Sequence, residues 1–207
     1  MWISVVTAFA QNETHRASKP EKIILIVGDS LSAEYGLPRG TGWVQAMVKQ
    51  ANQESVPLKV INASISGDTT SGGTTRLPQL LKTHGADIVV IELGGNDALR
   101  GLSLNMTQNN LKSMAQESRK AGAQVLLVAM QVPPNYGRNY RRQMDTAYSQ
   151  VAKETGAQLN TTFLKGVADD ADPLKWFQAD RIHPNEQAQI LMMKNIWPQL
   201  KKMLLSL

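Results

Sequence analysis

The sequence contains no cysteine, and this absence excludes three kinds of chemistry at once. A chain without cysteine has no thiol nucleophile, no disulfide bond and no thiolate metal site. Only three histidines are present, His15, His84 and His183, and they are too scattered to give the short ligand spacings of a zinc site. We therefore expect neither a metal nor another cofactor.

Long apolar runs and basic stripes studded with aromatics are also missing. No stretch approaches the roughly 20 apolar residues of a membrane span. The net charge is only +5, and the basic clusters at Arg138, Arg141 and Arg142 and at Lys201-Lys202 are typical of a solvated face. We expect a monomer that acts on small molecules, with no nucleic-acid partner and at most peripheral contact with a membrane.

The first ten residues indicate export. Trp2 to Ala10 is apolar and ends in Ala8-Phe9-Ala10, the small-x-small pattern of a signal-peptidase site. The basic segment that normally precedes such a stretch is missing, so a frayed N-terminal helix is the alternative. We interpret residues 1–10 as an incomplete signal peptide, residues 11–21 as a flexible tail and residues 22–207 as one globular domain of a periplasmic or secreted protein.

Apolar runs typical of buried strands alternate with segments of helical periodicity. The predicted strands cover about 23–27, 58–63, 88–93, 124–130 and 158–163, and the predicted helices about 43–53, 76–83, 106–121, 139–155 and 185–205. This alternation predicts an α/β protein with a parallel, doubly wound sheet. The residues from Val132 to Gly137 should form an irregular loop because they include consecutive prolines.

The last predicted helix carries one apolar face. Its members recur at helical spacing and should pack on the sheet: Ile190, Met193, Trp197, Leu200 and Leu204. Pro198 interrupts this helix, so we expect a kink or an early end there.

Three short polar blocks directly follow predicted strands. They are Gly28-Asp29-Ser30-Leu31, Ser66-Gly67-Asp68 and Gly94-Gly95-Asn96-Asp97. Because the carboxyl ends of parallel strands line one edge of an open sheet, a serine, a glycine and an asparagine are expected to meet there. Taken singly, each has an ordinary interpretation, Ser30 as a helix N-cap and the other two as turn residues.

A fourth block near the C-terminus, Asp180-Arg181-Ile182-His183, supplies the groups that activate a serine. A serine hydroxyl is a weak nucleophile and needs a base within hydrogen-bond reach. His183 lies before Pro184 on the loop that enters the last predicted helix, and Asp180 can fold back to orient its ring. The alternative is a solvated histidine beside a capping aspartate. The four blocks in this order favour a hydrolase.

Gly67 and Asn96 fit the remaining requirement of acyl transfer, a set of donors for the oxyanion. A glycine lets its backbone N–H approach closely, and an asparagine offers a neutral amide. One such donor is commonly worth ~3 kcal/mol.

Together the four blocks resemble those of the SGNH (GDSL) hydrolase superfamily, which centre on Ser, Gly, Asn and His. The similarity spans about residues 22–197 and is greatest to the bacterial periplasmic thioesterases and lysophospholipases of that superfamily. It implies a three-layer α/β/α, flavodoxin-like fold with a central parallel five-stranded sheet. It also implies metal-free hydrolysis of acyl esters, thioesters and lysophospholipids.

The resemblance assigns roles to individual residues. Ser30 would be the nucleophile that forms an acyl-enzyme, His183 its base and Asp180 the partner of His183. The backbone of Ser30, Gly67 and the side chain of Asn96 would form the oxyanion hole.

Substrate binding is predicted around the third and fourth loops. The apolar residues there suit an acyl chain: Leu99, Leu102, Met106, Val132 and Pro133. Glu34 stands where the family leads us to expect a small residue, and its carboxylate could alter which groups are accepted. A carbohydrate acetyl-esterase of the same superfamily is the alternative, although it would want a polar groove. A non-catalytic binding module would not need Ser30, Asp180 and His183 together.

Overall fold

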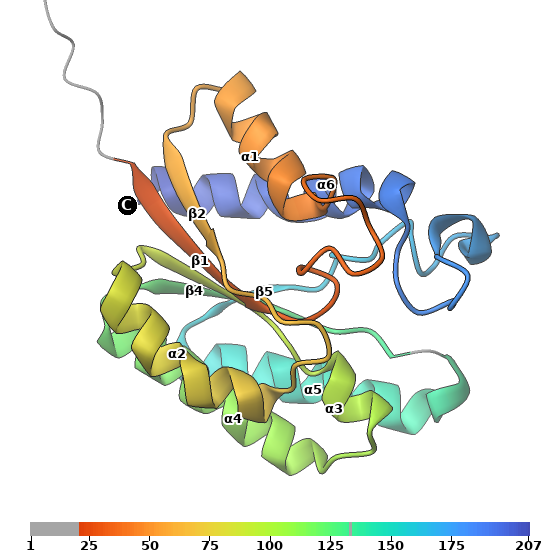
Figure 1. Cartoon of the computed structure of the whole chain (residues 1–207). Coiled ribbons are helices and arrows are strands. Elements are labelled where there is room, and N and C mark those ends of the chain that lie inside the picture. The colour runs from red at the N-terminus through yellow and green to blue at the C-terminus, as the bar shows by residue number, and fades with distance from the viewer. Residues whose placement is uncertain (1–20, 133) are drawn as a thin grey trace, which may run out of the picture.

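A five-stranded parallel sheet forms the centre of the molecule (Figure 1). The computed structural model describes residues 21–132 and 134–207, so the predicted signal peptide, nearly all of the predicted tail and Pro133 lie outside the described residues. The strands are β1 (Lys22–Gly28), β2 (Leu58–Asn62), β3 (Ile88–Glu92), β4 (Gln124–Val128) and β5 (Gln158–Asn160). Their order, β2-β1-β3-β4-β5 with every pair parallel, confirms the predicted flavodoxin-like sheet.

Helices cover both faces of this sheet, which gives the three predicted layers (Figure 1). One face carries α1 (Trp43–Gln53) and α6 (Glu186–Leu205), and the other carries α2 (Thr70–His84), α4 (Leu104–Lys120) and α5 (Gly137–Thr155). Short helices α3 (Gly95–Leu99), η1 (Pro134–Tyr136) and η2 (Pro173–Trp176) lie in connections. None of the helices in the described ranges is long and apolar enough to span a membrane.

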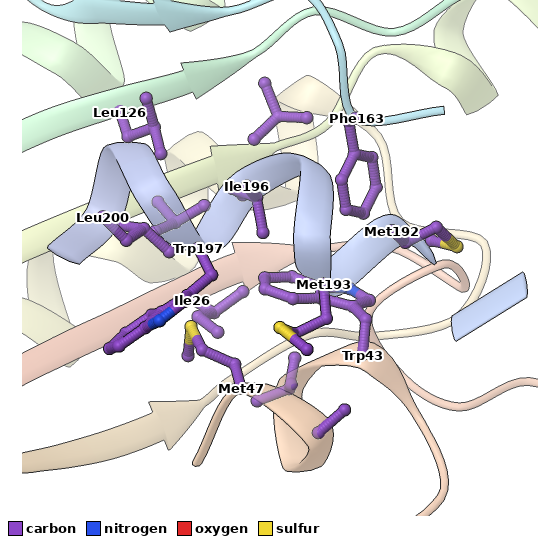
Figure 2. Close-up of a cluster of buried hydrophobic side chains, with 14 of the residues drawn as sticks. Ile26, Trp43, Met47, Leu126, Phe163, Met192, Met193, Ile196, Trp197 and Leu200 are labelled. Atoms are coloured by element: carbon purple, nitrogen blue, oxygen red, sulfur yellow. The ribbon is translucent and has the colours of Figure 1, made fainter. Parts of the chain in front are cut away.

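The central strands are apolar on both sides because both of their faces are covered. In β1, Ile24 and Ile26 point into the core beneath α1 and α6, whereas Leu25 and Val27 point into the core on the opposite face. Figure 2 shows the first of these cores, where the indole of Trp43 lies among residues of α6 and β1. Because all the strands run parallel, their carboxyl ends meet at one edge of the sheet.

Helix α2 begins at Thr70, six residues before the predicted start. The hydroxyl of Thr69 caps it by accepting a hydrogen bond from Gly72 N–H at 3.4 Å. The Gly/Thr-rich segment has weak helix propensity, so its sequence indicated a loop. Tertiary packing outweighs that propensity, because a Cβ at Gly73 would collide with Leu93 and only glycine lets the helix lie this close to the sheet.

Helix α6 corrects two other predictions. Pro198 does not end it early, since the helix continues to Leu205 and buries Leu200 and Met203 beyond the proline. Ile190 is 48% exposed, so it is not part of the face that packs on the sheet. The other predicted members, Met193, Trp197, Leu200 and Leu204, are buried as expected, and the fully buried Met192 and Ile196 join them.

Two ends of strands and one loop also differ from the sequence pattern. The fourth and fifth strands end at Val128 and Asn160, earlier than predicted. Phe163 has left the sheet and packs edge-on against Trp43, with ring centroids 5.4 Å apart. The predicted irregular loop contains the 3₁₀ turn η1, which starts at Pro134, because a proline is tolerated in the first turn of a helix.

Candidate active site

Ser30, His183 and Asp180 form a continuous hydrogen-bonded chain. The Nε2 atom of His183 lies 2.9 Å from Ser30 Oγ, and its Nδ1 atom lies 2.7 Å from Asp180 Oδ2. An ionised carboxylate can only accept, so Nδ1 carries the ring proton and Nε2 is free to accept the hydroxyl proton of Ser30. The structure thus brings together the three residues that the sequence pattern singled out for nucleophilic chemistry.

The turn after β1 holds Ser30, which is half-buried, within reach of His183. Asp29 organises this turn, because its Oδ1 accepts from Leu31 N–H at 3.0 Å and its carbonyl accepts from Ala33 N–H at 3.0 Å. No helix begins at Ser30, since the next one, α1, starts at Trp43. The interpretation of Ser30 as a helix N-cap is therefore wrong.

The loop before α6 is built around Asp180. Its Oδ1 accepts backbone hydrogen bonds from Ile182 at 2.9 Å and His183 at 3.0 Å, which leaves Oδ2 for the imidazole. Burial raises the pKa of Asp180, but these backbone hydrogen bonds and the one from the His183 ring outweigh it and lower the pKa to about 2. The aspartate therefore caps the loop and also supplies a permanent negative charge to His183.

Two of the three predicted oxyanion donors are unoccupied. Within the described residues, the backbone N–H groups of Ser30 and Gly67 have no hydrogen-bond partner. Gly67 has a positive φ of 78°, a conformation that favours glycine, and its carbonyl accepts from Arg100 Nη2 at 2.7 Å. The hydrogen bond from Arg100 holds the backbone at Gly67 in place, while the Gly67 N–H remains available as a donor.

The third donor, Asn96, is already engaged. Its Nδ2 donates to Asp29 Oδ2 at 3.0 Å and to the carbonyl of Asp68 at 2.9 Å. These bonds use both amide hydrogens, so Asn96 must release one acceptor before it can donate to a bound oxyanion. The same bonds tie the loop after β3 to those after β1 and β2.

Arg76, on α2, ties the first two of these loops together. Its Nε donates to Asp68 Oδ2 at 2.8 Å, Nη2 donates to Gly28 O at 3.3 Å, and Nη1 donates to Ala63 O. The side chain is only 19% exposed, so this ion pair is shielded from solvent and holds the loops in register.

The predicted substrate-binding residues differ in how exposed they are. Leu99 is 47% exposed at the end of α3, and Met106 on α4 is exposed as well. Val132 is buried in the core rather than in an open groove. The carboxylate of Glu34 accepts from the N–H groups of Gly40 and Gly42. Glu34 therefore has a structural partner of its own, on the loop that leads to α1.

Sequence reasoning missed several residues that support the site. Glu92 is fully buried below the turn that carries Ser30, and a lone carboxylate inside an apolar run was a signal that could have found it. Asp29 and Arg76 act on the site through contacts between loops far apart in sequence, for which the chain offers no local signal. Among the residues described, no three His, Asp or Glu side chains converge as candidate metal ligands.

Comparison with known proteins identifies the family of this chain. The family model described as the GDSL-like Lipase/Acylhydrolase family matches residues 26–189. The chain belongs to this family. It is therefore an enzyme, and the resemblance to SGNH hydrolases is confirmed.

Relatives of the family are similar over most of the chain. Esterase TesA of Pseudomonas aeruginosa is 46% identical over 87% of this chain and 89% of its own length. The Thioesterase 1/protease 1/lysophospholipase L1 of Escherichia coli K12 is 41% identical over 85% of this chain and 81% of its own. The crystal structure of the psychrotrophic esterase EstA from Pseudoalteromonas sp., inhibited by monoethylphosphonate, superposes with a TM-score of 0.82. It is 37% identical and covers 88% of this chain and 98% of that one.

Proposed function

We propose that this GDSL-family enzyme hydrolyses acyl esters and thioesters, lysophospholipids included, through an acyl-enzyme on Ser30. The observation that carries the proposal is the hydrogen-bonded chain from Asp180 through His183 to Ser30, with distances of 2.7 and 2.9 Å. Three side chains in this order convert a weak hydroxyl into a nucleophile. The relatives named as esterase, thioesterase and lysophospholipase support the class of substrate.

In the first half of the reaction, Ser30 Oγ attacks the acyl carbonyl as its proton passes to His183 Nε2. The charge that develops on the carbonyl oxygen is met by the N–H groups of Ser30 and Gly67 and by the amide of Asn96. His183 then gives its proton to the departing alcohol or thiol, which leaves the acyl group on Ser30. Asp180 stays ionised throughout and stabilises the imidazolium.

In the second half, water takes the place of the departed group. His183 accepts a proton from the water as its oxygen attacks the acyl carbonyl, and Ser30 leaves with that proton restored. The products are a free acid and an unchanged enzyme. No step requires a group other than the side chains and backbone named above.

Exposed apolar side chains close to site residues in the sequence support substrates with an acyl chain. Four large apolar side chains next to site residues are about half exposed: Tyr35, Ile65, Leu99 and Ile182. Ile65 precedes Gly67 by two positions, and Ile182 directly precedes His183. Exposed apolar groups of this kind around a reacting centre suit a hydrocarbon chain better than a carbohydrate.

Labelling and kinetics test the proposal. A fluorophosphonate should label the wild-type enzyme at Ser30, as mass spectrometry of the peptides would show. Ser30→Ala and His183→Ala should lower kcat by about 10⁵–10⁶ and Asp180→Asn by about 10⁴, with folding intact by circular dichroism. Ser71→Ala, an exposed serine on α2, serves as the control and should keep full activity. Retention of more than a tenth of kcat by Ser30→Ala would refute the assignment.

We also propose that the chain is exported, on the basis of Ala8-Phe9-Ala10 in the sequence. A periplasmic or secreted enzyme would meet acyl esters and lysophospholipids outside the cytoplasm.

A further inference from the structure

Two carboxyl groups lie buried directly beneath the nucleophile turn. Glu92 ends the central strand β3 with 0% exposure, and Asp29 follows the neighbouring strand β1 with 3% exposure. The parallel register pairs Glu92 with Gly28, which brings the two acids side by side. Neither belongs to the chain of groups that moves the proton in the proposed reaction.

Glu92 holds the nucleophile turn from below. Its Oε2 accepts a hydrogen bond from Ser32 Oγ at 2.6 Å and one from Asp29 N–H at 3.3 Å. The indole N–H of Trp43 in turn donates to Ser32 Oγ at 3.2 Å. One carboxyl oxygen thus fixes the residues on both sides of Ser30 and connects them to the core.

Asp29 links the turn at Ser30 to Asn96, the proposed side-chain donor to the oxyanion. Its Oδ2 accepts from Asn96 Nδ2 at 3.0 Å, while its Oδ1 is held by Leu31 N–H. The direction of the Asn96 amide therefore depends on where the Asp29 carboxylate is held. Glu92 Oε2 accepts from the backbone N–H of Asp29, so it holds the residue that carries this carboxylate.

Electrostatics favours one proton on this pair, carried by Glu92. Burial raises the pKa of both groups, to about 6 for Asp29 and well above the usual range for Glu92, whose pKa the neighbouring Asp29 raises further. A proton shared between the two carboxyl groups would lower the pKa of Asp29 and raise that of Glu92. Glu92 Oε1 is buried without a partner in the described residues, and a proton there would supply its missing bond.

We propose that Glu92 is a positioning residue, a neutral carboxylic acid that fixes the nucleophile turn and aims the Asn96 amide through Asp29. This role rests on the proposed function, because it matters only if Ser30 attacks and Asn96 stabilises the oxyanion. A neutral acid suits the place, since it can accept from Ser32 through one oxygen and donate to Asp29 through the other. Two adjacent anions in this buried position would instead repel each other.

Substitution of Glu92 separates this role from a merely structural one. Glu92→Gln keeps the shape, the acceptor for Ser32 and a donor toward Asp29, so kcat should stay within about threefold of wild type. Glu92→Ala removes all of these contacts, and kcat should fall about 10–100-fold with little change in KM, because small misplacements of catalytic groups cost up to about a hundredfold. Glu186→Gln, an exposed glutamate on α6, is the control.

Each outcome decides the proposal. A fall in kcat for Glu92→Gln as large as that for Glu92→Ala would overturn it, because the negative charge would then be what matters. A wild-type kcat for Glu92→Ala, with only a lower melting temperature, would also overturn it and leave Glu92 a structural residue. If Glu92→Ala does not fold, Glu92→Gln decides the question together with infrared difference spectroscopy. The band of a protonated carboxylic acid should be present in the wild type and lost in the variant at neutral pH.

The result can be told apart from a failure of the proposed function. Fluorophosphonate labelling of wild type reports on Ser30 without any change at Glu92. Labelling at Ser30 together with an unaffected Glu92→Ala rejects only the positioning role. Absence of labelling at Ser30 rejects the proposed function itself.

Discussion

The imidazole of His183 lies against the phenol ring of Tyr35, with ring centroids 4.3 Å apart and ring planes tilted by 35°. Tyr35 belongs to the turn that follows Ser30, and its N–H donates to the carbonyl of Ser30 at 3.3 Å. Its own carbonyl accepts from Gln178 Nε2 at 2.9 Å, on the loop that carries His183. One residue thus connects the segments that carry Ser30 and His183.

Tyr35→Ala should therefore lower kcat about three- to tenfold, whereas Tyr35→Phe should stay close to wild type. An aromatic pair is worth about 0.5–1.5 kcal/mol beyond the area it buries, and each 1.4 kcal/mol changes a rate about tenfold. The ring face matters here and the hydroxyl does not. Steady-state kinetics on a short-chain p-nitrophenyl ester would measure this, and equal rates for the Ala variant and wild type would contradict it.

The two hydrogen bonds that the Asn96 amide already donates lead to a second prediction. Asn96→Ala should lower kcat by roughly 10²–10³ with little change in KM, because the lost donor acts mainly in the transition state. Asn96→Asp should be at least as harmful, since it places a carboxylate against both Asp29 and the oxyanion. Kinetics on one soluble ester, with circular dichroism to confirm folding, provides the measurement. An unchanged kcat for Asn96→Ala would return Asn96 to the role of a turn residue.

Asp29 predicts a particular dependence of stability on pH. Burial raises the pKa of Asp29 from 3.8 to about 6, so the folded state holds this proton more tightly than the unfolded state. Its contribution to the free energy of unfolding is full below pH 3.8 and is lost as the pH rises through about 6. In Asp29→Asn this titration is absent.

Urea unfolding at several pH values would reveal the difference. The stability of wild type relative to Asp29→Asn should decrease on going from about pH 4 to pH 6, by on the order of 2–3 kcal/mol at about 1.36 kcal/mol per pKa unit. Asp145→Asn, at an exposed aspartate of α5, controls for the loss of a charge. Parallel curves for wild type and Asp29→Asn would show that Asp29 does not titrate in this range.

Processing of the N-terminus gives the last prediction. When the chain is expressed behind a basic n-region, signal peptidase should cleave after Ala10, so that the exported protein begins at Gln11. Mass spectrometry of the periplasmic fraction would identify the new terminus, and a change of Ala8 and Ala10 to Leu should block cleavage. An active protein that remains in the cytoplasm and retains Trp2 would contradict export.

The parallel strands and the residues at their carboxyl ends could be predicted from the sequence because both follow from local patterns, whereas the flavodoxin-like arrangement came from the family resemblance. A run such as 23–27 signals a buried strand by itself, and a serine directly after it must lie at the sheet edge. The start of α2 could not be predicted, because it depends on how closely Gly73 approaches Leu93. Ile190 was misplaced for a related reason, since helical spacing gives a face but not its rotation toward the sheet.

The candidate site, like the fold, could be predicted only in part. Ser30, Asp180 and His183 carry chemistry that their residue types indicate, and a hydrogen-bonded chain does join them. The hydrogen-bond partners of Asn96 could not be predicted, because Asp29 precedes it by 67 residues and contacts it only once the sheet has formed. Glu34 shows the opposite kind of error. Because it departs from the family pattern, the sequence suggested a functional role for it. Its carboxylate instead accepts hydrogen bonds from N–H groups of its own loop.

The hydrogen bond between Ser30 and His183 joins residues 153 positions apart, from the first strand to the loop before the last helix. Contacts of such long range close late, because the entropy of loop closure opposes them until much of the chain is in place. Recovery of esterase activity after dilution from denaturant should therefore lag behind the return of helical circular dichroism. Under this expectation, the rate at which activity returns reports when the segment that carries His183 reaches Ser30.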